Sequence, residues 1–154
     1  MPSPEALLDS NVVVAALAEE HQHHAPSLAI LQTAAAEALA VAAHSYAEAF
    51  VTLTRRGERR TFHRTPDQAW AALESVAAVT RLVGLTPSQT FDAVRAYAAA
   101  GGVGARVYDH LIGQAAVIAG APTIVTWNTG RLRSLFPALR VVTPEEYPAR
   151  TRSN

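Results

Sequence analysis

The sequence lacks both cysteine and lysine. Without cysteine the chain can form neither disulfides nor thiolate metal sites, so we expect it in a reducing compartment, the cytoplasm. All 13 basic residues are arginines, and they balance 13 acidic residues to a formal net charge of zero. Charge composition alone therefore does not predict binding to nucleic acid.

Long hydrophobic runs are also missing. No apolar run approaches the roughly 18 residues of a membrane-spanning helix, and residues 1–5 have no basic start, so we expect neither a membrane span nor a signal peptide. The 154 residues, 49% of them hydrophobic, fit one globular domain. We assign it to residues 1–148, with residues 149–154 as a loose C-terminal tail.

Several sequence motifs that define other α/β proteins are absent. Receiver domains and haloacid-type phosphatases normally place a lysine beside the phosphoryl group, and this chain has no lysine. No Gly-Lys-Ser/Thr sequence is present, which excludes a P-loop. No Gly-x-Gly-x-x-Gly follows the first strand pattern, which disfavours a dinucleotide-dependent oxidoreductase.

Strand and helix patterns alternate along the chain. Short apolar or β-branched runs predict strands at 6–8, 39–43, 81–85, 123–126 and 140–143. Helices are predicted at 11–17, 26–37, 45–55, 66–80, 87–100 and 107–119, two of them opened by a Thr-Pro-x-Gln cap. This order predicts an α/β protein with three layers, α/β/α, and a mostly parallel central sheet. Ligands bind such sheets beyond the carboxyl ends of the strands.

Three carboxylates follow predicted strands or lie on the helix that leads to one. Asp9 ends the first strand, Glu48 lies early in the helix after the second, and Asp109 lies in the first turn of the helix before the fourth. In a parallel sheet they can converge at one edge, where they would repel one another without a cation between them. Oxygen ligands suit a hard divalent ion, Mg²⁺ or Mn²⁺.

Each of these acids also has an ordinary structural explanation. Glu48 completes a capping box with Ser45, and Asp109 would favour a helix N-terminus through the helix dipole. Asp9 and Asn11 could belong to a simple turn or cap. The local sequence leaves both interpretations open, and the placement at successive strand ends favours a shared site.

Four sequence blocks together resemble the PIN domain family, and in particular its VapC-like toxins. Residues 7–13 (Leu-Leu-Asp-Ser-Asn-Val-Val) resemble its opening Asp-x-Asn motif, and residues 45–48 (Ser-Tyr-Ala-Glu) match its helix-borne glutamate. Residues 108–116 resemble its Asp-x-Leu-Ile-x-x-x-Ala helix, and residues 124–129 its Thr-x-Asp/Asn segment. The order and spacing of the blocks agree from residue 7 to residue 147.

The resemblance implies a PIN-like (Rossmann-like) fold and a function. Members are known as Mg²⁺- or Mn²⁺-dependent endoribonucleases that hydrolyse RNA phosphodiester bonds. In VapBC pairs such a nuclease is the toxin, and a small antitoxin protein blocks its site. For this chain the resemblance therefore implies an RNA substrate, a cognate antitoxin, a homodimer and a cytoplasmic location, with no membrane partner.

The resemblance also assigns site residues. Asp9, Glu48 and Asp109 would be the metal-binding and catalytic carboxylates. Asn128 stands where many members have a fourth acid, and would be a neutral catalytic ligand or a water-positioning group. Asn11 and Thr126 would orient Asp9 and the waters of the metal.

Arg131 departs from the family pattern, because members often carry a further aspartate there. Together with Asn128 it keeps open a second function: a degenerate PIN domain that binds RNA or a protein without cleaving. An arginine-rich stretch offers candidate contacts to RNA phosphates, or is a solvated connection between helices. The candidate RNA-binding residues are Arg55, Arg56, Arg59, Arg60 and Arg131.

Other ring-bearing residues are open to two interpretations. Trp127, next to Asn128, would either stack on an RNA base or pack within the fold. His21, His23 and His24 suggest zinc, but their spacing offers no ligand of another type, so we expect a mobile surface loop.

Overall fold

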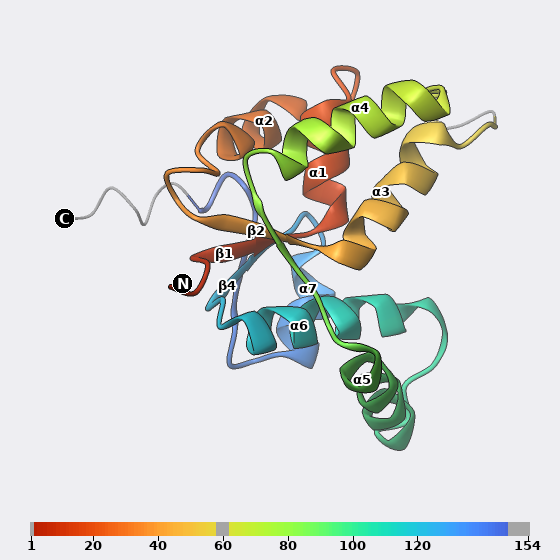
Figure 1. Ribbon diagram of the computed structural model, residues 1–154. Helices are drawn as coiled ribbons and strands as arrows, with labels where there is room; N and C mark the ends of the chain where they lie inside the picture. The colour runs from red at the N-terminus through yellow and green to blue at the C-terminus, as the bar shows by residue number, and fades with distance from the viewer. Residues whose placement is uncertain (1, 58–61, 148–154) are drawn as a thin grey trace.

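The computed structural model describes residues 2–57 and 62–147. Its central sheet has the strand order β3-β2-β1-β4-β5, and every ladder is parallel (Figure 1). The strands are β1 (Ala6–Leu8), β2 (Leu39–Ala42), β3 (Arg81–Val83), β4 (Thr123–Val125) and β5 (Arg140–Val142). The predicted α/β class with a parallel sheet is confirmed.

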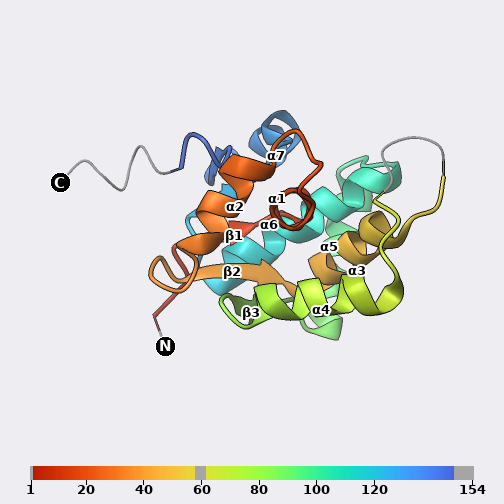
Figure 2. The same cartoon turned by 90° about the horizontal axis from the view of Figure 1, so that it is seen from above.

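Helices cover both faces of this sheet, as the three-layer prediction requires. One face is covered by α1 (Ser10–Leu17), α2 (His24–Gln32), α3 (Ala43–Thr54) and α4 (Pro66–Ala77). The other side carries α5 (Pro87–Ala99), α6 (Val107–Ala119) and α7 (Thr129–Leu135), with a short 3₁₀ turn, η1 (Gly104–Arg106), before α6. Figures 1 and 2 show α3 and α4 side by side at one end of their layer.

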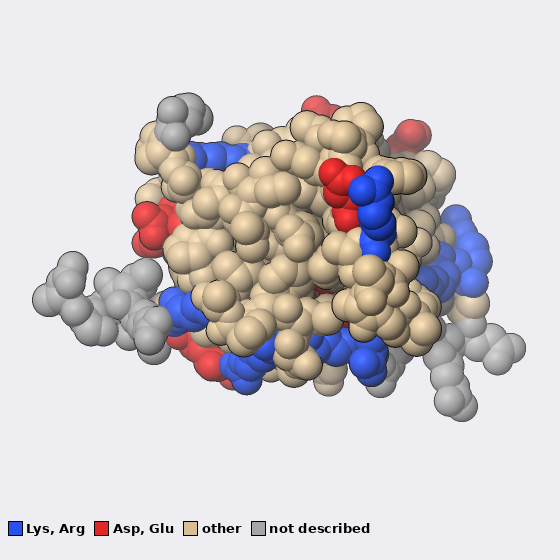
Figure 3. Space-filling model, turned by 90° about the horizontal axis from the view of Figure 1, so that it is seen from below, with Lys and Arg blue, Asp and Glu red and all other residues tan. Residues whose placement is uncertain are grey.

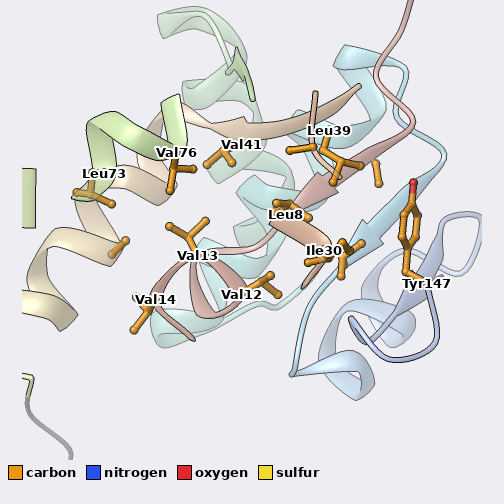
Figure 4. Packing of buried hydrophobic residues seen from close by; sticks show 14 of the residues in the cluster. Leu8, Val12, Val13, Val14, Ile30, Leu39, Val41, Leu73, Val76 and Tyr147 are labelled. Carbon is orange, nitrogen blue, oxygen red and sulfur yellow. The ribbon is translucent and has the colours of Figure 1, made fainter. Parts of the chain in front are cut away.

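The central strand β1 is buried on both faces. Leu7 packs toward α6 and α7, whereas Leu8 packs among Val12, Val13 and their neighbours on the α1 side (Figure 4). Double-sided burial explains why the strands are continuous apolar runs without polar alternation. Leu8 is level with Val125 in the sheet, so the residues that follow β1 and β4 meet at one edge.

The predicted helix ends are confirmed where the cap is local in sequence. Thr65 and Thr86 each form a complete capping box with the glutamine three residues later. Gly120 ends α6 with φ 77°, a left-handed conformation that glycine adopts without steric cost.

The predicted capping box at Ser45 and Glu48 is wrong. Helix α3 begins at Ala43, and Ala42, the last residue of β2, is its N-cap without a side-chain hydrogen bond. Because the chain passes directly from strand to helix, Ser45 lies in the first turn and is fully buried. Glu48 is therefore free of any capping role.

Two other helix predictions also differ from the structure. Helix α2 ends at Gln32 and does not reach residue 37, and a turn with Ala38 at φ 53° leads into β2. Helix α7 was not predicted. Within the described residues, no helix is long and apolar enough to cross a membrane. The predicted tail at residues 149–154 lies outside the described part of the chain.

Candidate functional site

Asp9 lies at the carboxyl end of β1 and is the N-cap of α1. Its backbone N–H continues the sheet by donating to Val125 O at 2.9 Å. Its carboxylate accepts from Ser10 N–H at Oδ1 (2.7 Å) and from Thr126 Oγ1 at Oδ2 (2.8 Å). The residue is only 6% exposed. Asp9 is thus both a helix cap and a rigidly oriented buried acid.

Asn11 and Thr126, to which the resemblance assigns the orientation of Asp9, both form hydrogen bonds with its carboxylate. The Asn11 amide donates to Thr126 Oγ1 (3.1 Å) and to Asp9 Oδ2 (3.4 Å). Its Oδ1 accepts from the backbone N–H of Trp127 at 3.1 Å, and Thr126 Oγ1 accepts from that of Asn128 at 3.0 Å. This network ties the start of α1 to the segment between β4 and α7.

Glu48 lies on α3 with its carboxylate turned to the same region. Ser10 Oγ donates to Glu48 Oε2 at 3.3 Å, and His44 Nε2 lies 3.5 Å from Glu48 Oε1. Burial raises the pKa of Glu48, and the charges of Asp9 and Asp109 raise it further. Burial also lowers the pKa of His44, which favours the neutral imidazole beside Glu48.

Asp109 enters the site from the opposite layer, in the first turn of α6. Burial raises its pKa, while the nearby guanidinium groups of Arg131 and Arg106 lower it. Arg131, on α7, has Nη1 3.9 Å from Asp109 Oδ2. Arg131 therefore lies beside one of the three acids.

The three carboxylates form one electrostatic group. Burial is the main cause of the raised pKa of Asp9, and the charge of Asp109 adds to it. The charges of Asp9 and Asp109 both raise the pKa of Glu48. Among the described residues, no three His, Cys, Asp or Glu side chains form a ready-made ligand cluster for a metal ion. The acids are thus close enough to repel one another without already enclosing an ion.

Other predicted site residues lie at the border or beyond it. Asn128 is exposed and is the N-cap of α7, where its backbone contacts Thr126. Arg55 and Arg56 are exposed just after α3. Two predicted RNA contacts, Arg59 and Arg60, lie outside the described residues.

Sequence reasoning missed two residues that contact the acids, Ser10 and His44. Ser10 is adjacent to Asp9 and binds both Asp9, through its N–H, and Glu48, through its hydroxyl. His44 precedes Glu48 by four residues, the spacing that brings two side chains together on one helix face. That spacing was the available signal for His44, whereas nothing local joins Ser10 to Glu48.

Trp127 packs within the fold. Its indole stacks on the His23 ring, with centroids 3.9 Å apart and planes 11° from parallel, and its Nε1–H donates to Ser27 Oγ at 2.9 Å. His24 Nδ1 lies 2.9 Å from Ala15 O. Of the histidines predicted to form a mobile loop, His24 therefore contacts α1, His23 stacks on Trp127, and His21 stacks on Phe62.

An open cleft of about 710 Å³ begins beside the acids. Ser10 and Asn11 line its inner end. It continues past Thr52 and Arg55 to Glu20, His21 and Phe62. The cleft therefore connects the acidic group with the loops that follow α1 and α3.

Comparisons with known proteins agree with this architecture. The family model described as PIN domain matches residues 6–134. A comparison with curated proteins finds no match.

Three solved structures share the fold. VapBC2 from Rickettsia felis, bound to a DNA fragment from its promoter, has a TM-score of 0.61 at 17% identity, covering 88% of this chain and 96% of that chain. FitAcB from Neisseria gonorrhoeae has a TM-score of 0.57 at 19% identity, covering 92% of this chain and 99% of that chain. PAE2754 from Pyrobaculum aerophilum has a TM-score of 0.60 at 17% identity, covering 97% of this chain and 90% of that chain. At these identities the likeness shows a common fold.

Proposed function

The chain belongs to the PIN domain family, and from this premise we propose that it is a Mg²⁺- or Mn²⁺-dependent endoribonuclease that hydrolyses RNA phosphodiester bonds. One observation carries the proposal: Ser10 binds the carboxylates of both Asp9 and Glu48, and the charge of Asp109, from a third element, raises the pKa of each. A partly buried group of acids that repel one another is unfavourable for stability, which supports a functional role for it.

The chemistry of these side chains fits a divalent metal ion. All three offer hard carboxylate oxygens, and Glu48 Oε1 is buried without a hydrogen-bond donor among the described residues. Mg²⁺ keeps several of its waters when protein carboxylates hold it, so direct contact with all three acids is not required. Asp9, Glu48 and Asp109 would hold the ion, which supplies an activated water and stabilises charge on the phosphodiester.

The remaining residues have supporting roles in this proposal. Thr126 and Asn11 fix the orientation of Asp9, and Ser10 fixes that of Glu48. Arg131 places a guanidinium beside Asp109, where it can interact with a substrate phosphate. Asn128 would contribute its amide from the N-cap of α7.

We extend the proposal to a toxin that pairs with a small antitoxin protein in the cytoplasm. The structural neighbour from Rickettsia felis is a VapBC2 assembly on promoter DNA, and it supports a protein partner of this type. Co-expression with the product of the adjacent reading frame tests this. We expect a stable complex in which RNA cleavage is suppressed.

A homodimer is part of the same proposal. Seen from below, most of the surface is uncharged apart from its margins and one adjacent acidic and basic pair (Figure 3). The exposed apolar side chains on α5 and α6 include Phe91, Val94, Val117 and Ile118. Exposed apolar side chains that gather on one surface often mark protein contacts. Sedimentation analysis of the purified chain should give twice the monomer mass.

The decisive experiment is cleavage of labelled RNA by the purified protein in Mn²⁺, compared with excess EDTA. Asp109→Asn is the matched control, because it removes one charge and leaves the hydrogen bonds around Asp9 unchanged. We expect cleavage only by the native chain with metal. RNA binding without cleavage would instead support the degenerate PIN domain, the alternative that Asn128 and Arg131 favour.

A further inference from the structure

The cleft beside the acids has the size and lining of a nucleotide-binding site. Its volume of about 710 Å³ lies within the usual range of roughly 300–1,000 Å³ for small-molecule pockets. Polar and apolar side chains share its wall, among them Ser10 and Asn11 at the acid end and Val14 and Phe62 farther out. Ser10 and Asn11 in its wall contact Asp9 and Glu48, so a ligand in this cleft would lie next to the acids that we assign to phosphodiester hydrolysis.

Two rings form a platform in the cleft wall. The rings of Phe62 and His21 are stacked, with centroids 6.0 Å apart and planes 25° from parallel. Both line the cleft, and neither is fully buried. Flat side chains of this kind bind nucleobases through their π-faces with little dependence on base identity.

The platform is held in place by contacts between two loops. Arg64 forms an ion pair with Glu20 (2.8 Å), donates to Phe62 O from Nη1 (2.8 Å) and bonds Leu53 O through its backbone N–H (2.9 Å). Between Phe62 and Arg64 in the chain, His63 adopts φ 49°, a left-handed conformation that is unfavourable for a residue with a Cβ. Such strain is retained where the surrounding contacts impose it, which is frequent at ligand sites.

The charge of the cleft also suits a phosphate backbone. Glu20 is its one acidic residue among the described residues that line it, and Arg64 neutralises Glu20. Arg55 lines the cleft, is exposed, and forms no ion pair within the described part of the chain. Its guanidinium can therefore contact a phosphate oxygen.

We propose that this cleft binds one unpaired nucleotide of the RNA next to the scissile phosphate, with its base stacked on the Phe62 ring, which His21 supports from behind, and its backbone contacted by Arg55. The inference rests on the proposed ribonuclease function for its substrate class. It adds a structural requirement, because a base held in a duplex is already stacked and paired and does not reach the platform.

The test measures binding separately from cleavage. The probe is a single-stranded RNA of about twelve nucleotides that carries one 2-aminopurine, with the same sequence as a duplex for comparison. Binding is measured in the Asp109→Asn background, where the RNA stays intact. Three changes are compared: Phe62→Leu, which removes the ring but keeps apolar volume; Phe62→Tyr, which keeps the ring; and Trp70→Leu, at an exposed ring on α4 outside the cleft.

We expect Phe62→Leu to weaken binding of the single strand by about tenfold, within the usual effect of one base–aromatic stack, and to abolish the quenching of 2-aminopurine. Phe62→Tyr restores both, Trp70→Leu changes neither, and the duplex binds all variants equally. Unchanged affinity and quenching in Phe62→Leu would overturn the proposal. So would an equal loss in Phe62→Leu and Phe62→Tyr when both have the parent melting temperature.

Arg55→Gln provides an independent measurement on an exposed residue that does not affect folding of the core. It should reduce the slope of log K against log salt for the single strand by about 0.7, the value for one phosphate contact, whereas Arg95→Gln on α5 should not change it. An unchanged slope in Arg55→Gln overturns the phosphate contact. If the native chain binds as predicted but does not cleave RNA, the nuclease proposal fails and the nucleotide site stands. If it cleaves and Phe62→Leu has no effect, only the nucleotide site fails.

Discussion

Thr126 Oγ1 donates a 2.8 Å hydrogen bond to Asp9 Oδ2, joining β4 to the end of β1 at the carboxyl edge of the sheet. Both residues are buried. The same oxygen accepts the backbone N–H of Asn128 at 3.0 Å. One hydroxyl therefore controls the orientation of the most buried acid and of the segment that leads into α7.

Thr126→Val tests this relationship, because it replaces the hydroxyl by a methyl group of similar size. We expect the free energy of unfolding to fall by about 1–3 kcal/mol, since Asp9 loses a donor and Asn128 N–H loses an acceptor in a buried place. RNA cleavage should fall as well. Urea denaturation and initial cleavage rates measure the two effects, and Thr126→Ser should recover most of both.

Thr123→Val is the matched control on the same strand. Thr123 is buried, but its side chain makes no hydrogen bond within the described residues. Its substitution should therefore leave stability unchanged or slightly higher. Equal losses from Thr126→Val and Thr123→Val would show that the hydroxyl of Thr126 has no special role.

Glu48→Gln should abolish cleavage without destabilising the protein. The folded state raises the pKa of Glu48, so the ionised side chain is less favourable in the folded chain than in the unfolded one. This cost is absent below the ordinary glutamate pKa of about 4.3 and grows as pH rises toward and through the raised value. The variant should therefore equal or exceed the native melting temperature at pH 7, with the difference shrinking toward pH 4.

The melting temperature should also report metal binding. Mg²⁺ or Mn²⁺ offsets the repulsion among the acids, so millimolar metal should raise the native melting temperature at pH 7 and have little effect near pH 4. Glu48→Gln should lose most of this increase. A variant that melts several degrees lower than the native chain at pH 7 would show that Glu48 is a structural residue.

The sequence predicted the parts of the fold that depend on local pattern. The strands around Leu7 and Val41 could be predicted from their apolar composition alone, because both faces of these strands are buried. The helix caps at Thr65 and Thr86 could each be predicted from four consecutive residues. The Ser45 box failed because burial of α3 against the sheet begins the helix two residues earlier, at Ala43.

Contacts between distant residues were beyond local pattern. The rule that parallel strands end at one edge makes Asp9, Glu48 and Asp109 candidates for one site, and the resemblance to the PIN family assigns them to it. The contact of Ser10 with Glu48, and that of Trp127 with Ser27, join residues 38 and 100 positions apart. Only the packed structure supplies such pairs, and it also decided between the two interpretations of Trp127.

Gly113 of α6 offers a test of packing away from the acids. A Cβ added there would lie 1.9 Å from the Phe136 ring, which packs against the core cluster on that side. Gly113→Ala should therefore lower the free energy of unfolding by about 1–3 kcal/mol, the usual cost of overpacking. Gly130→Ala on α7 meets no atom within 4 Å and should be neutral or slightly stabilising. Urea denaturation of the pair decides, and equal stabilities would contradict the predicted contact.

Two residues of the site should limit the number of metal ions that it binds. Asn128 and Arg131 stand where the family often has acids, so the site holds about two fewer negative charges than a fully acidic one, and affinity for divalent ions depends on ligand charge. We expect one weakly bound Mg²⁺ or Mn²⁺ in the protein without RNA. Asn128→Asp should tighten it, and calorimetry measures both the number of ions and the affinity. Two tight sites in the absence of RNA would refute this expectation.

Arg131→Ala separates metal binding from transition-state stabilisation. Arg131 lies 3.9 Å from Asp109, and its charge lowers the pKa of that acid. Removing the guanidinium takes a positive charge away from the metal site, so divalent affinity should stay the same or increase. Cleavage should nevertheless slow by at least tenfold, because the guanidinium no longer stabilises charge developing on the phosphate. Arg95→Ala, which removes an exposed arginine on α5, should change neither quantity. An Arg131→Ala protein that cleaves RNA at the native rate would remove this arginine from the mechanism, and one with weaker metal binding would show that it supports the acids and does not act on the substrate.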